Sequence, residues 1–335
     1  MKKIYLLLIL ISIALMFGCF ETWYPIYHDW LSTINIDGTD LNYIRDSYGS
    51  FLLSPDRETL IEYSSNKFWS VDPTNLSNRT LLHDFGDDSD AIFYPTLSNS
   101  LIAFTHHMEV YTYDLKSRDT TKLTFTEDMV LNWYPAFSSD GTKIAYSTIS
   151  DSFTSIVIMD SDGSNKNVVC EFDNIGIDTR YIMSIRFVSN DQVLLYVINE
   201  SPDSTVDRGI YSICTDGTDN HCIVEDVYPR YLTLSPNKDY ILFAAGGYIH
   251  KVNVDGTNHV LLGAAGDDFF DPSISPDGEK VLFTYGDYPY IMNADGSNRY
   301  QVIDVHIGSF YHDQKESFFI NNYKILLNLE KQINK

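Results

Sequence analysis

A repeat of about 44 residues sets the tightest limit on how this chain can fold. Two copies of it, at 135–165 and 272–298, match closely, and a third at 234–258 is similar. Each copy begins with a Ser-Pro-Asp-Gly type of turn and an apolar run. It ends in an Asp-Gly turn followed by Ser or Thr and then Asn. Self-similarity at a fixed period is typical of arrays in which one unit cannot bury its apolar face alone.

The spacing of the copies indicates a β-propeller. The serine of each first turn recurs at steps of 44, 40, 51, 46 and 40 residues, and a propeller blade of four short strands has this length. Weaker copies start near Phe51, Tyr94 and Ile185. The marking serines are Ser54, Ser98, Ser138, Ser189, Ser235 and Ser275.

Turn composition supports an all-β fold. Gly and Asn recur where tight hairpins need a positive φ at low steric cost. We expect the Asp and Asn side chains of these turns to bond their own backbone. No sustained helical periodicity is visible after residue 18. The Asp-Gly turns start at Asp37, Asp162, Asp216, Asp255 and Asp295.

The length predicts seven blades. Of the 335 residues, about 49–304 carry six contiguous copies. Segment 30–44 is expected to supply outer strands, and segment 309–329 inner strands, of a closing blade built from both ends of the chain. Closure of the ring hides sheet edges that otherwise invite aggregation. A ring of six blades with an irregular C-terminal tail is the alternative.

The N-terminus has the layout of an export signal. Lys2 and Lys3 precede an apolar run over 4–17, which is too short for a comfortable membrane span, and Gly18-Cys19 follows. This arrangement resembles the lipobox of bacterial lipoproteins, which implies cleavage before Cys19, lipid on Cys19 and, without a following Asp, an outer-membrane destination. Plain secretion is the alternative. The expected organisation is a signal peptide at 1–18, a lipid anchor and tether at 19–29, and one propeller domain at 30–335.

The repeats themselves resemble the TolB-like, WD-repeat-like β-propeller family, over about 49–304. This resemblance implies a propeller but no single activity. Its members include the periplasmic partner of the Tol–Pal envelope system, propeller domains of serine peptidases and lipoproteins of unknown role. TolB itself carries an additional α/β domain before the propeller, whereas only about 30 residues lie between the expected signal peptide and the first copy in this chain.

Charge narrows the range of partners. The formal net charge is −23 and the sequence pI is about 4.5, which excludes a nucleic-acid reader because phosphate binding needs a basic surface. The same acidic charge argues against docking on anionic lipid through a basic patch. We therefore expect contact with a membrane only through lipid on Cys19. We expect a monomer that binds an envelope protein or peptide.

One face of the propeller is the candidate binding surface. The turns between the first and second strands and between the third and fourth strands share one face, and the blade-to-blade connections lie on the other. Aromatic-proline pairs in those connections are expected to ring the channel mouth, because aromatics and Arg are enriched at recognition surfaces. Packing of blade on blade is the alternative role for these rings. The candidate mouth residues are Tyr94, Trp133, Tyr134, Arg180, Tyr228, Arg230 and Asp271.

Motifs for catalysis are not found in the sequence. It has no Gly-x-Ser-x-Gly elbow and no His-Glu-x-x-His zinc motif. Asp160 and Asp162 are not part of a twelve-residue calcium loop closed by a bidentate Glu, so a bound calcium is an open alternative and not a prediction. No cofactor, metal site or catalytic residue is predicted, although His106, His250 and His306 could converge at the channel. Cys214 and Cys222 flank a turn, which is compatible with a disulfide or with two free thiols.

Two functions follow from these features. The first is a non-enzymatic envelope lipoprotein whose propeller is a platform for a protein or peptide. The second is a carbohydrate-active lyase or hydrolase, or a sugar-binding module, working at the channel mouth. The second needs His or carboxylate side chains that converge there.

Overall fold

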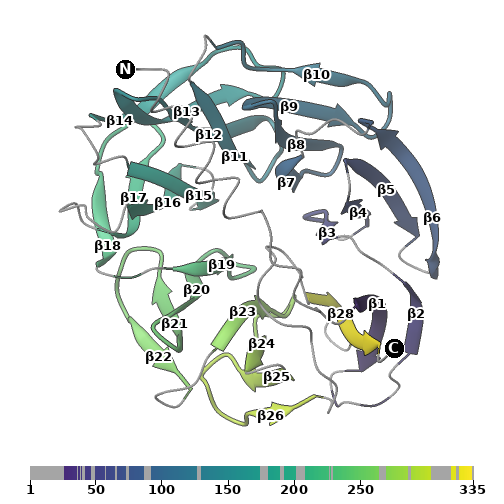
Figure 1. Ribbon diagram of the computed structural model, residues 1–335. Coiled ribbons are helices and arrows are strands. Elements are labelled where there is room, and N and C mark those ends of the chain that lie inside the picture. Colours follow the sequence, from purple (N-terminus) through teal and green to yellow (C-terminus); the bar gives the residue numbers. More distant parts are fainter. Residues whose placement is uncertain are drawn as a thin grey trace, which may run out of the picture.

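The computed structural model shows an all-β protein of four-stranded sheets arranged in a ring (Figure 1). The predicted β-propeller with four-stranded blades is confirmed. No helix occurs among the residues that the structure describes, and so none there is long and apolar enough to cross a membrane. The structure describes residues 26–35, 37, 39, 42–46, 50–56, 58–64, 66–72, 75–86, 92–126, 130–173, 180–188, 192–200, 208–225, 227, 229–263, 269–285, 288–302, 318–321 and 324–333.

Six blades each come from one contiguous stretch of chain and are numbered here in chain order. Blade 1 contains β3 (Ser50–Leu53), β4 (Leu60–Ser64), β5 (Lys67–Asp72) and β6 (Asn75–Asp84). Blade 2 contains β7 (Phe93–Leu97), β8 (Leu101–His106), β9 (Glu109–Asp114) and β10 (Thr120–Lys122). Blade 3 contains β11 (Leu131–Phe137), β12 (Lys143–Ile149), β13 (Phe153–Asp160) and β14 (Asn167–Asp173).

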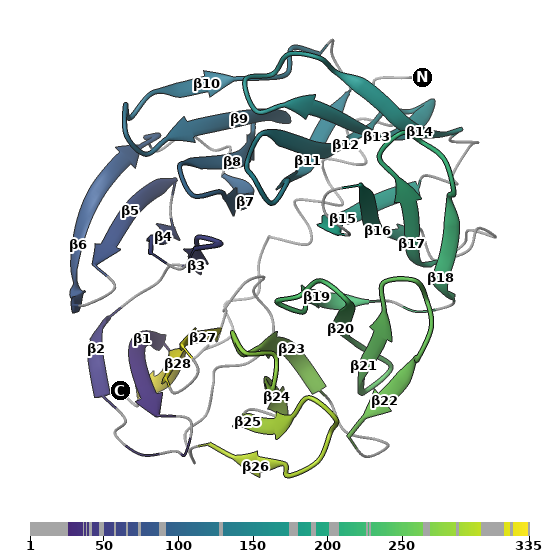
Figure 2. The ribbon, with the colours of Figure 1, turned by 180° about the vertical axis from the view of Figure 1, so that it is seen from behind.

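The next three blades repeat the same order. Blade 4 contains β15 (Arg180–Val188), β16 (Val193–Glu200), β17 (Gly209–Cys214) and β18 (His221–Glu225). Blade 5 contains β19 (Arg230–Leu234), β20 (Tyr240–Ala245), β21 (Tyr248–Asn253) and β22 (Val260–Leu262). Blade 6 contains β23 (Phe269–Ile274), β24 (Lys280–Tyr285), β25 (Tyr288–Asn293) and β26 (Tyr300–Gln301). The first strand of each blade lies innermost in the ring (Figures 1 and 2).

A seventh four-stranded sheet joins the two ends of the chain, in the order β2-β1-β28-β27. Its strands are β1 (Ile26–Asn35), β2 (Asn42–Asp46), β27 (Phe318–Asn321) and β28 (Lys324–Ile333). The register of β1 on β28 runs from Ile26 opposite Ile333 to Asn35 opposite Lys324. β1 starts at Ile26, four residues before the expected domain start at 30, so part of the expected tether is a strand.

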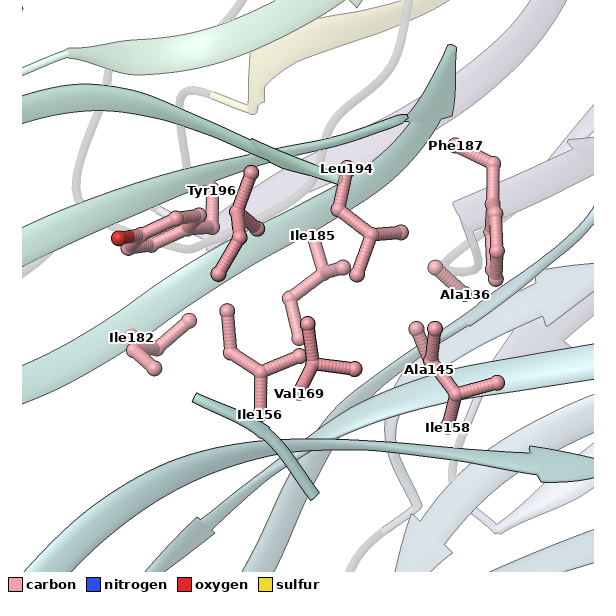
Figure 3. Close-up of a cluster of buried hydrophobic side chains, with 11 residues drawn as sticks. Ala136, Ala145, Ile156, Ile158, Val169, Ile182, Ile185, Phe187, Leu194 and Tyr196 are labelled. Carbon is pink, nitrogen blue, oxygen red and sulfur yellow. The ribbon is translucent and has the colours of Figure 1, made fainter. Parts of the chain in front are cut away.

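The core lies between blades rather than inside any one of them. The middle strands β12 and β13 are buried along nearly their whole length, whereas the outer strand β6 is mostly exposed. Figure 3 shows one layer, in which Ile156 and Val169 of blade 3 meet Ile182 and Leu194 of blade 4. Fully burying one such aliphatic side chain contributes about 1.5–3 kcal/mol. A lone repeat would expose these side chains and lose this contribution, so it is not expected to be stable alone.

The turn serines are structural. Ser138 is 4% exposed, donates its hydroxyl hydrogen to Asp140 Oδ1 at 2.7 Å and accepts the backbone N–H of Lys143 at 2.9 Å. Ser275 repeats these contacts in blade 6. The backbone N–H of Thr142 and the Ser138 hydroxyl lower the pKa of Asp140 to about 2. Ser189 lies outside the described residues.

The Asp-Gly turns have the predicted local bonds and also join neighbouring blades. Asp216 Oδ1 accepts the backbone N–H of Thr218 at 2.9 Å and its hydroxyl at 2.6 Å. Gly217 has a φ of +86°, and a Cβ added there would lie 2.7 Å from the carbonyl oxygen of Val169 in the preceding blade. A glycine is therefore needed at Gly217 both for the turn and for the close approach of two blades.

The cysteines within the described part of the chain are free thiols. Cys214 lies opposite Val193, and Cys222 lies opposite Tyr211. The two cysteines are therefore not cross-strand partners, and the alternative of free thiols describes the structure. Burial raises the pKa of Cys170 to about 11. Cys19 lies outside the described residues.

Candidate functional site

The predicted mouth residues lie at the start of innermost strands, apart from Tyr228, which lies outside the described residues. Tyr94 belongs to β7, and Trp133 and Tyr134 belong to β11. The backbones of Arg180, Arg230 and Asp271 lie in β15, β19 and β23, in three further blades. We call the face where these strands begin the connection face, and the opposite one the turn face.

An aromatic group bridges blades 2 and 3 on the connection face. The rings of Tyr94 and Tyr134 have centroids 3.9 Å apart. The ring of Phe93 stacks on the indole of Trp133, with centroids 5.7 Å apart and planes 16° apart. The indole of Trp133 also lies 5.6 Å from the ring of Tyr94. The structure therefore brings together three of the seven predicted mouth residues, Tyr94, Trp133 and Tyr134.

Two bulges hold the tyrosines in place. Tyr94 and Tyr134 have φ values of 50° and 55°, in the left-handed region that a bulky residue seldom adopts. Each precedes a proline, which has no N–H to give to the strand ladder. Accordingly the register of β7 on β8 skips between Phe93 and Thr96, and that of β11 on β12 skips between Trp133 and Ala136. Strained backbone of this kind persists only where the surroundings fix it, and it concentrates at functional sites.

Three exposed apolar side chains lie on the connection face of blade 2. Phe93 is 41% exposed, Met108 in the β8–β9 turn is 55% exposed, and Phe125 after β10 is 75% exposed. Met108 accepts the backbone N–H of Asn132 at 2.9 Å through its carbonyl oxygen, which ties its turn to the start of β11. We call the set the apolar patch; it consists of Phe93, Tyr94, Met108, Phe125, Trp133 and Tyr134.

A buried carboxylate joins the segments that carry the patch. Glu109 is 5% exposed. Its Oε2 accepts the Thr124 hydroxyl and, at 2.9 Å, the side-chain amide of Asn132. Its Oε1 accepts the backbone N–H of Thr126 at 2.8 Å and lies 3.3 Å from Lys122 Nζ. Burial works to raise the pKa of Glu109, but the bonds from Thr124 and Thr126 and the charge of Lys122 outweigh it, so the pKa is lowered.

This network satisfies the polar groups beneath the patch. The side-chain oxygen of Asn132 accepts the Thr148 hydroxyl at 2.9 Å, and the backbone oxygen of Asn132 accepts the Thr105 hydroxyl at 3.2 Å. Asn132 and Thr148 are buried. The indole N–H of Trp133 is different, because it is buried with no hydrogen-bond partner among the described residues.

The histidines considered for a metal do not form a common site in the described part of the chain. His106 packs beside His107, with ring centroids 4.0 Å apart, in blade 2. His250 lies in blade 5, where its Nδ1 is 2.9 Å from His259 Nε2 and its Nε2 is 3.1 Å from the carbonyl oxygen of Ala245. His306 is outside the described residues. No group of three or more His, Cys, Asp or Glu side chains suited to a metal occurs among the described residues.

Asp160 and Asp162 are engaged in their own turn. Asp162 Oδ1 accepts the backbone N–H of Ser164 at 2.9 Å. Asp160 accepts Lys143 Nζ at 2.9 Å and Asn165 Nδ2 at 2.6 Å. These bonds give both carboxylates local partners without an ion.

Sequence reasoning found the aromatic-proline pairs but missed much of the site. The exposure of Met108 and Phe125 and the contacts of Glu109 depend on how neighbouring blades meet. A signal for Phe93 was present, because it directly precedes the first aromatic-proline pair. Met108 and Phe125 carry no comparable signal in the sequence.

Comparison with solved structures places this fold among β-propellers of several kinds. An oligogalacturonate lyase in complex with manganese aligns with a TM-score of 0.64 at 13% identity, covering 83% of this chain and 88% of that one. The oligogalacturonate lyase of Vibrio parahaemolyticus aligns with a TM-score of 0.67 at 10% identity, covering 91% and 98%. The putative TolB of Agrobacterium tumefaciens aligns with a TM-score of 0.53 at 15% identity, covering 92% and 100%.

No protein-family model matches this chain, and no curated protein is similar to it in sequence. At these identities the structural likeness concerns the fold alone. The chain therefore shares its propeller with TolB and with the oligogalacturonate lyases, and its function has to be argued from its own surface.

Proposed function

We propose that this protein is a non-enzymatic lipoprotein of the bacterial cell envelope, and that its propeller binds a protein or peptide partner on the apolar patch. The observation that carries the proposal is that the connection face of blade 2 exposes Phe93, Met108 and Phe125 from three separate connections, beside a group of packed aromatic rings that includes Phe93. Contiguous exposed apolar side chains on a soluble domain mark interaction sites. Aromatic residues and Met are also enriched in the buried centre of interfaces.

The connection face is the better candidate because, on the turn face, turns of different blades are hydrogen-bonded to one another. There the Lys238 ammonium donates to the Ser139 hydroxyl, although blade 4 lies between their blades. The backbone N–H of Asp56 donates to Asn99 Oδ1 at 3.3 Å, from blade 1 to blade 2. Some polar groups of the turn face are thus bonded to neighbouring turns, whereas the apolar patch exposes Phe93, Met108 and Phe125.

The cellular address is part of the proposal and rests on the sequence. The run over 4–17 and Cys19 support export and lipidation, with the outer membrane as destination. Likeness of the fold to a putative TolB is in line with an envelope location.

A carbohydrate ligand is the second candidate, favoured by the oligogalacturonate lyases among the similar structures. Tyr and Trp rings can stack on sugars, but a sugar also needs many hydrogen-bond partners for its hydroxyls. Near the apolar patch the polar side chains of Asn132, Thr124 and Glu109 are bonded to one another. Phe93, Met108 and Phe125 have side chains that offer no conventional hydrogen bond. The chemistry of the patch therefore favours a peptide.

The test is affinity capture from solubilised envelopes with patch variants and a matched control. Phe125→Ser should reduce recovery of the partner strongly, and Tyr94→Ala with Tyr134→Ala should do the same. Leu81→Ser removes a side chain that is 47% exposed on the outer strand β6 and should leave recovery unchanged. Cys19→Ser provides the unlipidated control. Equal recovery by all folded variants would reject the patch as the binding site.

A further inference from the structure

Within the described part of the chain, the indole N–H of Trp133 is a hydrogen-bond donor without an acceptor. Its nitrogen is buried and has no acceptor among the described residues. Leaving a buried donor unsatisfied destabilises the folded protein, and such groups in native proteins call for an explanation. An acceptor supplied by a bound partner would recover this free energy.

The polar groups around Trp133 are bonded to one another. Its own carbonyl oxygen accepts the Ser147 hydroxyl at 3.2 Å. The side-chain amide of the preceding Asn132 donates to Glu109 Oε2 and, at 3.2 Å, to Thr126 Oγ1. With these groups committed, a ligand on the patch meets mostly aromatic and apolar side chains, the hydroxyls of Tyr94 and Tyr134, and the Trp133 N–H.

Phe93 lies over the indole and is the most exposed ring of the aromatic group. It is 41% exposed and is held by stacking against Trp133. Tyr94 and Tyr134, in contrast, sit on bulges with positive φ that fix their backbone. Of these rings, Phe93 is therefore the one that a partner reaches first.

We infer that the partner segment is an extended, proline-containing peptide whose backbone carbonyl oxygen accepts the Trp133 indole N–H when the ring of Phe93 moves aside. This inference rests on the proposed function and names the chemistry of its partner. A polyproline II segment has no internal hydrogen bonds, so its carbonyl oxygens are free, and its low entropy suits docking on aromatic side chains. The net charge of −23 further favours a peptide that carries Lys or Arg.

The probe is a capped oligoproline peptide flanked by lysines, titrated into the ¹⁵N-labelled full chain without its signal peptide. The readout is the indole ¹H–¹⁵N resonance of Trp133, assigned from its absence in Trp133→Phe. A saturable downfield shift of this resonance, with midpoint at or below about 1 mM, is the expected result. The same peptide with alanines in place of prolines is the matched ligand control and should bind more weakly.

Variants separate this inference from the proposed function. Trp133→Phe keeps an aromatic ring but no donor, so affinity for the peptide should fall by about 3–10-fold, as expected for one neutral hydrogen bond. Phe93→Ala should speed exchange of the indole proton with water and tighten binding. If Trp133→Phe binds the peptide as wild type does, or if the resonance does not shift, the inference is wrong. The apolar patch would still stand as the binding site provided that Phe125→Ser loses the captured partner.

A sugar ligand is tested in the same titration. Oligogalacturonate replaces the peptide, with all other conditions kept. A saturable shift of the Trp133 resonance with the oligosaccharide and none with the peptide would overturn the inference and also favour the second candidate function. No shift with the oligosaccharide is the expected result.

Discussion

Tyr94 and Tyr134 occupy equivalent positions in neighbouring blades, and their rings meet at a centroid distance of 3.9 Å. Both residues have positive φ and both precede a proline at a bulge. The contact is therefore a product of the repeat: the same local irregularity, used twice, points two rings at each other. Their pairing couples the conformations of blades 2 and 3 at the proposed binding surface.

A double-mutant cycle tests this coupling. Tyr94→Ala, Tyr134→Ala and the double variant are compared by urea unfolding. An interaction free energy of about 0.5–1.5 kcal/mol is expected, because a close aromatic pair contributes that much beyond area burial. Additive effects would show that the rings are merely adjacent. Tyr134→Phe is the control that keeps the ring and should leave the coupling in place.

The fold was predictable from the sequence because blade chemistry is local. Ser138 and Asp140 bond within five residues of their turn, and Asp216 bonds two residues ahead. Such contacts follow from residue type and spacing alone. The start of β1 at Ile26 has no local signal, because β1 owes its pairing to β28, about 300 residues away. Nothing in a short window of sequence carries that contact.

The site was predictable only in part. The proline after Tyr94 and Tyr134 gave a local signal for an irregular strand start. The stacking of Phe93 on Trp133 depends on the angle between two sheets, and the burial of Glu109 depends on Asn132 in the next blade. Contacts of this kind lie between units of the repeat, so inspection of one unit could not show them.

The approach of Gly217 to the preceding blade predicts an unusually sensitive position. Gly217→Ala places a Cβ about 2.7 Å from the carbonyl oxygen of Val169 and also strains a φ of +86°. Gly278→Ala is the matched control, since its φ is +77° but its nearest neighbour, Pro236 Cδ, is 3.8 Å away. We expect the control to cost about 1 kcal/mol and Gly217→Ala roughly 1–3 kcal/mol more. Urea unfolding that gives equal losses would contradict the inter-blade contact.

The closing sheet predicts a strong effect of truncation at the C-terminus. A stop after Tyr323 removes β28, which lies between β1 and β27. Loss of this central strand should lower Tm by at least about 10 °C, taking roughly 2–4 °C per kcal/mol for a domain of this size. A stop after Ile333 retains all of β28 and is the control. An unchanged Tm in the shorter variant would show that the ring does not depend on this closure.

The buried carboxylate of Glu109 predicts a pH dependence with a defined sign. Its pKa is lowered in the folded protein, so its ionised form stabilises the fold. That contribution is present above the unfolded pKa of about 4.3 and is lost as pH falls through the lower folded value. Glu109→Gln keeps the shape of the side chain but removes the negative charge that the Lys122 ammonium and the Thr126 N–H stabilise.

We expect Glu109→Gln to lower the free energy of unfolding by about 1–3 kcal/mol at pH 7. The difference from wild type should shrink as pH falls below about 4. Urea unfolding at pH 7, 5 and about 3.5 measures this difference directly. Asp162→Asn, on the exposed turn face, is the control for general charge removal and should show a much smaller effect. A difference that stays constant over this range would mean that the Glu109 charge does not stabilise the patch, and that the surrounding hydroxyls and amides hold it in place without it.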